Sequence, residues 1–129
     1  VVHNNVNKLN PHKNTFKYLQ GNSQTYEMVD RLKELTSDID ILFIDGDHSH
    51  QAVINDFMLY ESMVQSGGYV VFDDYHDHGP GCGVFEAVNE ISNEVTDIYN
   101  IIGPLPNIFG ARGLPDTQPE GNDFIIQKK

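Results

Sequence analysis

Two stretches of similar form decide the fold: DILFIDGDH at residues 40–48 and GGYVVFDD at residues 67–74. Each is a short apolar run that ends abruptly in carboxylates. Continuous apolar runs of this length are typical of strands that are buried on both faces, as in parallel sheets. Since an amphipathic stretch separates the two runs, we expect a strand, a crossover helix and a second, parallel strand.

A parallel pair would bring the carboxyl ends of both strands to one edge of the sheet, where open α/β sheets bind ligands. The side chains expected to gather there are Asp45, Asp47, His48, Asp73 and Asp74. Several ionised carboxylates in one cleft repel one another unless a cation lies between them. All-oxygen ligation selects Mg²⁺, Mn²⁺ or Ca²⁺ over Zn²⁺. We therefore predict that Asp45, Asp73 and Asp74 bind a divalent cation, with Asp47 or His48 beside it.

The alternative for these acids is a purely structural role. Aspartates at the ends of parallel strands often cap the next helix or form a turn. For a single aspartate that role is common, whereas two neighbouring strand ends that both carry acids favour the cation.

The length and charge of the chain limit the classes of function. The 129 residues suit a single domain, residues 1–129, which is small for a complete doubly wound sheet. A formal net charge of −11 argues against nucleic acid or an anionic membrane as the main partner. The single cysteine, Cys82, excludes an internal disulfide and suits a reducing compartment. Because we find no signal peptide and no apolar run long enough for a bilayer, we expect a cytoplasmic location.

The remaining sequence predicts further strands and helices around the two apolar runs. Residues 1–14 form either a short helix or an irregular start. In chain order we expect a strand at 15–20, a helix from Ser23 or Thr25 to about Leu35, a strand at 39–44, a helix at 49–65 stopped by Gly67-Gly68, a strand at 69–72, a loop at 75–83, a helix at 84–95, a strand at 98–102, a connection at 104–121 and a final strand at 124–127. This order, β-α-β-α-β-α-β-β, indicates an α/β fold with a mostly parallel sheet.

Histidines near the acidic strand ends leave a second type of site open. They occur two residues apart, at positions 48 and 50 and again at 76 and 78, and such sets can ligate a transition metal. His48, directly after an aspartate, is better placed as a general base or a substrate contact. Cys82 lies between glycines with no basic neighbour in the sequence, so we interpret it as incidental.

At these residues the chain resembles class I S-adenosylmethionine-dependent methyltransferases. Within that family it is most similar to the branch of macrocin-type O-methyltransferases and cephalosporin-hydroxylase-like proteins. The resemblance is carried by FIDGDHSH at 43–50, by Asp56 in the following helix and by GGYVVFDDY at 67–75. The turn LQGNSQ at 19–24 resembles the adenine-contacting turn of catechol-type O-methyltransferases. GNDFII at 121–126 is similar to the family's last, antiparallel strand, so that the match covers about residues 15–128.

This resemblance implies roles for individual residues. Asp45, which ends the family's fourth strand, and Asp73 and Asp74, which end the fifth, would hold Mg²⁺. The ion would orient a hydroxyl of a small acceptor molecule and lower its pKa for attack on the cofactor's methyl group. Asp45 or His48 would take the proton. The cofactor S-adenosyl-L-methionine would contact Gly21, Asn22, Ser23, Gln24 and Asp45, with Ser23 and Gln24 at its adenine ring.

The sequence departs from the family where the methionine end of the cofactor should bind. No G-x-G pattern occurs before Gly21, and there is no room for the first two β-α units of the family's fold. In the family those strands lie between the strands expected here at 15–20 and 39–44, so their absence would expose two sheet edges. We therefore expect the carboxyl-terminal half to two-thirds of the fold: a truncated reading frame, a processed product, or a chain that completes its sheet as a homo-oligomer.

Two other functions stay open at this stage. A non-catalytic metal- or ligand-binding α/β domain derived from the same fold agrees with the missing glycine-rich turn. A metal-dependent hydrolase or oxygenase would use His48, His76 or His78 together with the acids. The loops at 75–83 and 104–121 carry no pattern that identifies an acceptor.

Overall fold

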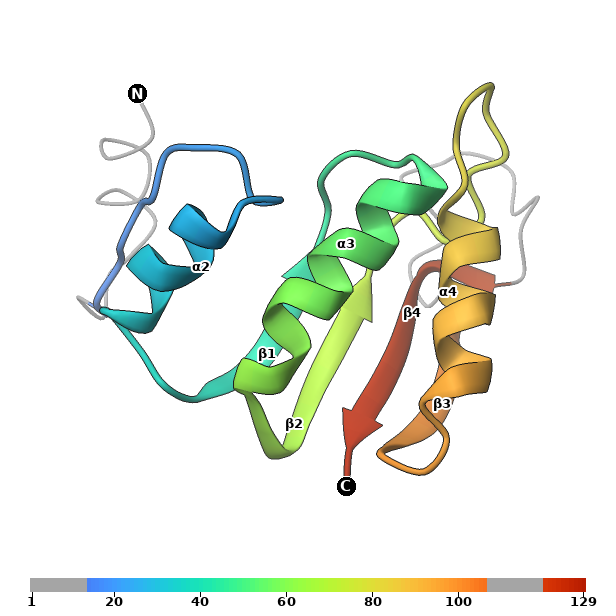
Figure 1. Ribbon diagram of the computed structural model, residues 1–129. Coiled ribbons are helices and arrows are strands. Elements are labelled where there is room, and N and C mark those ends of the chain that lie inside the picture. The colour runs from blue at the N-terminus through green and yellow to red at the C-terminus, as the bar shows by residue number, and fades with distance from the viewer. Residues whose placement is uncertain (1–13, 107–119) are drawn as a thin grey trace.

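A strand, a helix and a second, parallel strand follow one another, as residues 40–74 predict (Figure 1). The computed structural model describes residues 14–106 and 120–129. The elements in chain order are α2 (Tyr26–Lys33), β1 (Ile39–Ile44), α3 (His50–Tyr60), the 3-10 helix η1 (Glu61–Met63), β2 (Val64–Phe72), α4 (Val84–Glu94), β3 (Tyr99–Pro106) and β4 (Glu120–Lys128).

The four strands form one sheet in the order β1-β2-β4-β3. β1 and β2 run parallel with Ile44 opposite Phe72, so both strands end at the same edge of the sheet. β4 is antiparallel to β2 on one side and to β3 on the other. The α/β class and the antiparallel last strand are thus confirmed, and the parallel part of the described sheet is the β1–β2 pair.

One face of the sheet carries the hydrophobic core, because α3 and α4 lie side by side over it (Figure 1). The ring of Phe57 on α3 lies 5.9 Å from that of Phe72 on β2 and 6.0 Å from that of Tyr99 on β3. Val70 and Ile126, on neighbouring strands, are fully buried in the same cluster. This packing holds the two parallel strands in the register that positions their acidic ends.

The outer edge of β1 has no neighbouring strand in the part of the chain that the structure describes. Ile41 is 62% exposed and Phe43 is 53% exposed, although both belong to a continuous apolar run. The prediction that this run is buried on both faces is therefore wrong for β1, because no described helix covers the face opposite α3. α2 lies beyond this edge and packs against the end of α3 and η1 through Val29 (Figure 1).

The helices begin and end close to the predicted residues in two of three cases. Thr25 caps α2, since its Oγ1 accepts a 3.3 Å hydrogen bond from the backbone N–H of Met28. α4 spans Val84–Glu94, as the apolar spacing at 84–95 predicts. No helix within residues 14–106 and 120–129 has the length and apolarity that crossing a membrane requires.

The predicted helix at 49–65 is wrong after Tyr60. α3 ends at Tyr60, a short 3-10 turn follows, and β2 already begins at Val64. Gly67 and Gly68 therefore lie inside a strand and do not stop a helix. The register of the β1–β2 pairing shifts at this point, and Gly67 has a φ of 85°. The glycines thus form a bulge in the strand, which the apolar spacing did not reveal.

The strand predicted at 15–20 is also wrong, because residues 14–20 follow an irregular path into α2. Phe16 and Tyr18 are exposed. A strand is stable only with a neighbour that accepts and donates its backbone hydrogen bonds, and no described strand lies beside this segment. The predictions for residues 1–13 and for most of the connection at 104–121 lie outside the described residues.

The packing of the core predicts that two Ile→Val substitutions differ in their effect on stability. Ile126 is fully buried and Ile102 is 53% exposed. We expect Ile126→Val to lower the free energy of unfolding by about 0.5–1.5 kcal/mol, because the lost methyl group leaves a cavity. Ile102→Val should change it little. Urea denaturation of both variants measures the difference, and equal losses would contradict the described core.

Candidate functional site

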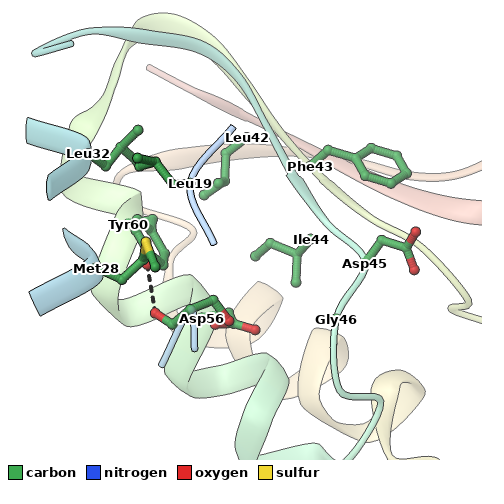
Figure 2. Close-up of a pocket in the computed structure, with 11 residues that line it drawn as sticks. Leu19, Met28, Leu32, Leu42, Phe43, Ile44, Asp45, Gly46, Asp56 and Tyr60 are labelled. Atoms are coloured by element: carbon green, nitrogen blue, oxygen red, sulfur yellow. Dashed lines mark hydrogen bonds between the residues drawn. The ribbon is translucent and has the colours of Figure 1, made fainter. Parts of the chain in front are cut away.

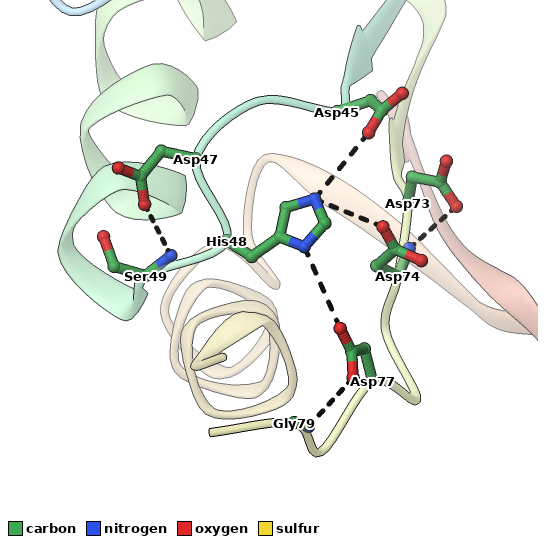
Figure 3. Close-up of polar contacts among 8 residues, drawn as sticks. All are labelled: Asp45, Asp47, His48, Ser49, Asp73, Asp74, Asp77 and Gly79. Carbon is green, nitrogen blue, oxygen red and sulfur yellow. Dashed lines mark hydrogen bonds and ion pairs between the residues drawn. The ribbon is translucent and has the colours of Figure 1, made fainter. Parts of the chain in front are cut away.

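The carboxyl ends of β1 and β2 bring Asp45, His48 and Asp74 together (Figure 3). His48 Nε2 lies 3.2 Å from Asp74 Oδ2 and 3.8 Å from Asp45 Oδ1. One donor atom from each residue lies within 4.8 Å of the other two. All three side chains are partly exposed, so an ion or a small polar molecule can reach them from solvent. This convergence is the arrangement that the parallel topology predicts.

Backbone geometry at the end of β2 sets the position of Asp74. The N–H of Asp73 donates to the carbonyl oxygen of Ile44 at 3.0 Å, which extends the pairing of β1 and β2. Asp74 then adopts a φ of 56°, and its N–H donates to Asp73 Oδ1 at 2.8 Å. Left-handed backbone is uncommon outside glycine, and aspartate is among the residues that tolerate it best. This turn directs Asp74 toward His48, while Asp73 points the other way (Figure 3).

Asp73 faces another acid that the motifs did not single out. Asp123 on β4 lies beside the end of β2 because Phe124 pairs with Phe72. Burial raises the pKa of Asp123, and the carboxylates of Asp73 and Asp74 raise it further. The antiparallel register is the signal that could have identified it. The edge therefore holds more negative charge than the two acidic strand ends alone.

Asp47 takes no part in the cluster, contrary to the expectation that it gathers there. Its Oδ1 accepts a 2.8 Å hydrogen bond from the backbone N–H of Ser49, just before α3. This hydrogen bond lowers the pKa of Asp47. For this residue the structural role in a turn is the correct interpretation.

On its other ring nitrogen, His48 faces the loop at 75–83. His48 Nδ1 lies 4.0 Å from Asp77 Oδ2 (Figure 3), and Cys82 offers its sulfur within 4.8 Å of donor atoms from both residues. Neither contact can be predicted from the sequence, because both depend on how the loop packs against the residues at the start of α3.

The remaining described histidines do not form the pairs of metal ligands that their spacing left open. His50 Nε2 lies 2.9 Å from Glu90 Oε2. The ring of His76 lies against Tyr75, and that of His78 lies against Phe85. Among the described residues, the groups of three donors that could hold a metal ion contain His48 and no other histidine.

A cavity of about 300 Å³ lies beside the cluster, between α2, β1 and α3 (Figure 2). Its apolar wall includes Leu19, Met28, Leu32, Leu42 and Ile44. Its polar wall includes Ser23, Asp45, Asp56 and Tyr60. Asp45 belongs to both the cavity lining and the cluster, although its carboxylate points away from Met28 and Asp56 (Figure 2). A molecule in the cavity would therefore lie near the end of β1, on the other side of the strand from that carboxylate.

Asp56 is a buried acid in the wall of this cavity. It is 5% exposed, and its Oδ1 has no hydrogen-bond partner among the described residues. Burial raises the pKa of Asp56, while a hydrogen bond with the Ser23 side chain lowers it in part. The carboxyl group lies between Tyr60 and Gly46 (Figure 2). A buried acceptor without a donor is uncommon and fits a site that a ligand completes.

Of the turn at 19–24, Leu19 and Ser23 reach the cavity, and Ser23 is the one of these two that was predicted to contact the cofactor. Ser23 lines the cavity, and its carbonyl oxygen accepts a 2.6 Å hydrogen bond from the Tyr60 hydroxyl. Asn22 Oδ1 accepts from the N–H of Gln24 at 3.0 Å and so closes the turn before α2. Gly21, Asn22 and Gln24 do not line the cavity. The contacts of all four residues with a cofactor stay a prediction.

The fold and the site together define an α/β domain with an acidic carboxyl edge next to a ligand-sized cavity. A family model described as a methyltransferase domain matches residues 2–75, more than half of the chain, and this match includes both acidic strand ends. The chain belongs to this family of methyltransferase domains.

Two similar proteins extend this comparison. An uncharacterized protein of Acanthamoeba polyphaga mimivirus is 39% identical over 134 residues, which cover 95% of this chain and 59% of that protein. The structure of the MycE methyltransferase from the mycinamycin biosynthetic pathway, in complex with Mg and SAH, matches with a TM-score of 0.54 and 17% identity. That match covers 87% of this chain and 32% of MycE. The chain therefore spans about three-fifths of the first protein and a third of the second, and the likeness to MycE shows the fold.

The burial of Asp56 predicts a pH-dependent effect of Asp56→Asn. Because the raised pKa means that the folded state binds the proton more tightly than the unfolded state, the contribution of Asp56 to stability is present at low pH and is lost as the pH rises. The asparagine has no charge to bury. We therefore expect a larger free energy of unfolding than wild type at pH 7, with a difference that shrinks toward about pH 4, the usual pKa of an exposed aspartate.

Urea denaturation across this pH range measures the effect. Asp97→Asn, at an exposed position, is the matched control and should change stability little. A less stable Asp56→Asn variant at pH 7 would show that the carboxylate is stabilised by contacts that the described chain does not contain.

Proposed function

We propose that this chain is an S-adenosyl-L-methionine-dependent, divalent-metal-assisted O-methyltransferase of a small hydroxylated substrate, or a part of one. The observation that carries the proposal is the convergence of Asp45, His48 and Asp74 beside a cavity that Asp45 also lines. Membership in the methyltransferase-domain family supports the class of reaction. The formal charge of −11 supports a small molecule rather than nucleic acid as the acceptor.

The donors at the sheet edge fit a hard divalent ion such as Mg²⁺. Asp45 and Asp74 offer carboxylate oxygens close to one another. We also propose Asp73 as a ligand because it follows the same strand, although its side chain points away from His48 (Figure 3). Mg²⁺ usually binds through one or two carboxylates and keeps several water molecules, which suits a partly exposed cluster. When bound, such an ion supplies Lewis acidity toward the acceptor's hydroxyl group.

His48 is the residue best placed to receive the proton of that hydroxyl. Its Nε2 points into the cluster, toward Asp45 and Asp74 (Figure 3). Asp74 at 3.2 Å would favour the positive charge that the ring acquires. Asp45 is the second candidate for this role, as the family resemblance implies.

The cavity fits an organic cofactor that combines an apolar body with hydrogen-bond donors. Its apolar wall can cover a ring system, and Asp56 Oδ1 offers an acceptor that no described group uses. We assign the cofactor contacts to Gly21, Asn22, Ser23, Gln24 and Asp45. The position of Ser23 and Asp45 in the wall supports this assignment for those two residues.

The likeness to MycE, whose structure is described as a complex with Mg and SAH, supports the pairing of a metal ion with this type of cofactor. Membership in the macrocin-type and cephalosporin-hydroxylase-like branch is a further part of the proposal, carried by the FIDGDHSH and GGYVVFDDY runs.

A cytoplasmic location is proposed from the single cysteine alone.

The alternative is a non-catalytic metal- or ligand-binding domain derived from the same fold. The open edge of β1 favours it, because the family's first strand, with its glycine-rich turn, would lie there and no described strand does. In that case the acids would still bind an ion, while S-adenosylmethionine would bind weakly or not at all.

Binding of S-adenosylhomocysteine and Mg²⁺ separates the two. We expect both ligands to bind the wild-type chain in calorimetric titrations. S-adenosylhomocysteine at a hundred times its dissociation constant should raise the free energy of unfolding by about 2.7 kcal/mol. Asp45→Asn and Asp74→Asn should abolish the saturable heat of Mg²⁺. Asp47→Asn is the matched control, because this acid lies in the same loop but bonds to Ser49, and it should retain Mg²⁺ binding.

Each outcome has a distinct meaning. Mg²⁺ binding without any effect of S-adenosylhomocysteine supports the non-catalytic alternative. If neither Mg²⁺ nor S-adenosylhomocysteine gives a saturable heat of binding at millimolar concentrations, the proposal is overturned. Methyl transfer to hydroxylated acceptors then needs testing only where both ligands bind.

We also propose that the chain completes its sheet by pairing β1 with a second copy. The outer edge of β1, which no strand of the described residues pairs, and the exposed Ile41 and Phe43 support this arrangement, because an open apolar edge is a template for another strand. We expect a dimer in analytical ultracentrifugation and a shift toward monomer in Ile41→Lys. Ile102→Lys, on the opposite edge strand β3, is the control and should leave the dimer intact. A wild-type chain that stays monomeric at high concentration would refute the pairing.

A further inference from the structure

Cys82, the only cysteine in the 129-residue chain, lies in a second group of potential metal ligands. One donor atom each from Cys82, His48 and Asp77 lies within 4.8 Å of the other two. This group differs from the acidic cluster in chemistry, because it contains a sulfur donor. The two groups share only His48, whose Nε2 faces Asp45 and Asp74 while its Nδ1 faces Asp77.

Backbone contacts hold the loop of Cys82 against the segment of His48. The N–H of Gly83 donates to the carbonyl oxygen of His48 at 2.8 Å. Within the loop, the N–H of Cys82 donates to the carbonyl oxygen of Gly79 at 3.0 Å. The approach is close enough to require glycine, since a Cβ on Gly83 would lie 2.7 Å from the backbone nitrogen of His50. Main-chain contacts therefore hold the backbone of Cys82 close to the backbone of His48.

Asp77 is fixed in the same way. Its Oδ1 accepts a 2.8 Å hydrogen bond from the N–H of Gly79, which leaves Oδ2 on the side of His48 (Figure 3). Cys82 and His48 are both partly buried, and Asp77 is exposed at the rim. An ion from solvent can thus enter past Asp77 and meet the sulfur and the imidazole nitrogen behind it.

The donors select a different ion from the one that suits the acidic cluster. Thiolate and imidazole are preferred by Zn²⁺ and similar ions, whereas carboxylates and water suit Mg²⁺. Three protein ligands with a water molecule in the fourth position form a common tetrahedral zinc site. The thiol of Cys82 would lose its proton to solvent as the sulfur binds the ion.

We propose that Cys82, His48 and Asp77 bind a thiophilic divalent ion of the Zn²⁺ class, in competition with the acidic cluster for His48. A Zn²⁺ ion bound at Nδ1, the nitrogen that faces Asp77, would leave the neutral ring with its proton on Nε2, so that His48 could no longer take a proton on the side of Asp45 and Asp74. The site would therefore act as an inhibitory metal site next to the proposed active site. The binding itself does not depend on methyl transfer and can be tested without it.

Co²⁺ is the probe, because a cobalt–thiolate bond gives a near-ultraviolet charge-transfer band that nitrogen and oxygen ligands do not give. The wild-type chain, kept reduced, should develop this band on titration with Co²⁺, and Zn²⁺ should remove it while excess Mg²⁺ should not. Since the chain has one cysteine, the band can come only from Cys82, and Cys82→Ser and Cys82→Ala should both lack it. Circular dichroism shows whether either variant still folds.

Further variants test the other two ligands. His48→Ala and Asp77→Asn should each weaken the Co²⁺ affinity measured by the band about tenfold or more. Asp45→Asn is the matched control and should retain the band, because Asp45 belongs only to the acidic cluster. A wild-type chain without the band, a band that grows only with protein concentration through bridging of two chains, or a band unchanged in both His48→Ala and Asp77→Asn overturns the proposal.

Discussion

The parallel pairing of β1 and β2 is the constraint on which the site depends. With Ile44 opposite Phe72, the next residues of both strands, Asp45 and Asp73, must emerge at one edge. The register is held by apolar packing, because Phe72 has to face Phe57 on α3. A slip by one residue would turn every side chain of a strand to the other face. Burial of hydrophobic rings therefore fixes where the charges lie.

The carboxylates at this edge repel one another, and the structure reduces this repulsion in two ways. Asp74 lies against His48, and Asp123 is held with a raised pKa beside Asp73 and Asp74. Asp56 is buried in the neighbouring cavity, also with a raised pKa. An acid with a raised pKa in the wall of a cavity, as Asp56 is, is more typical of a functional site than of a structural one. Holding these acids close together lowers the free energy of unfolding, and a bound cation or ligand would raise it again.

His48 joins the two halves of the edge. The strand ends place acids on one side of its ring, and the loop at 75–83 places Asp77 and Cys82 on the other. The first arrangement follows from the sheet, and the second follows from the bond between Gly83 and His48 that closes the loop. The His48 ring therefore lies between two groups of potential metal ligands. Asp45 and Asp74 offer only oxygen, whereas the group of Asp77 and Cys82 includes sulfur, so we expect different ions to bind on the two sides of the ring.

Apolar periodicity in the sequence determined β1 at residues 39–44 and α4, and the antiparallel last strand followed from the family resemblance. The strand–helix–strand order predicted that five side chains meet at one edge, and of these Asp45, His48 and Asp74 do so. The sequence did not determine the absence of a strand at 15–20, since strand formation needs a partner that local spacing cannot supply. The bulge at Gly67 and Gly68 arose from register, which is a property of two strands. Only the tertiary structure decided that Asp47 turns away, that Asp123 joins the acids and that Cys82 approaches His48. Each of these depends on contacts between segments distant in the chain, and hydrophobic patterning carries no information on them.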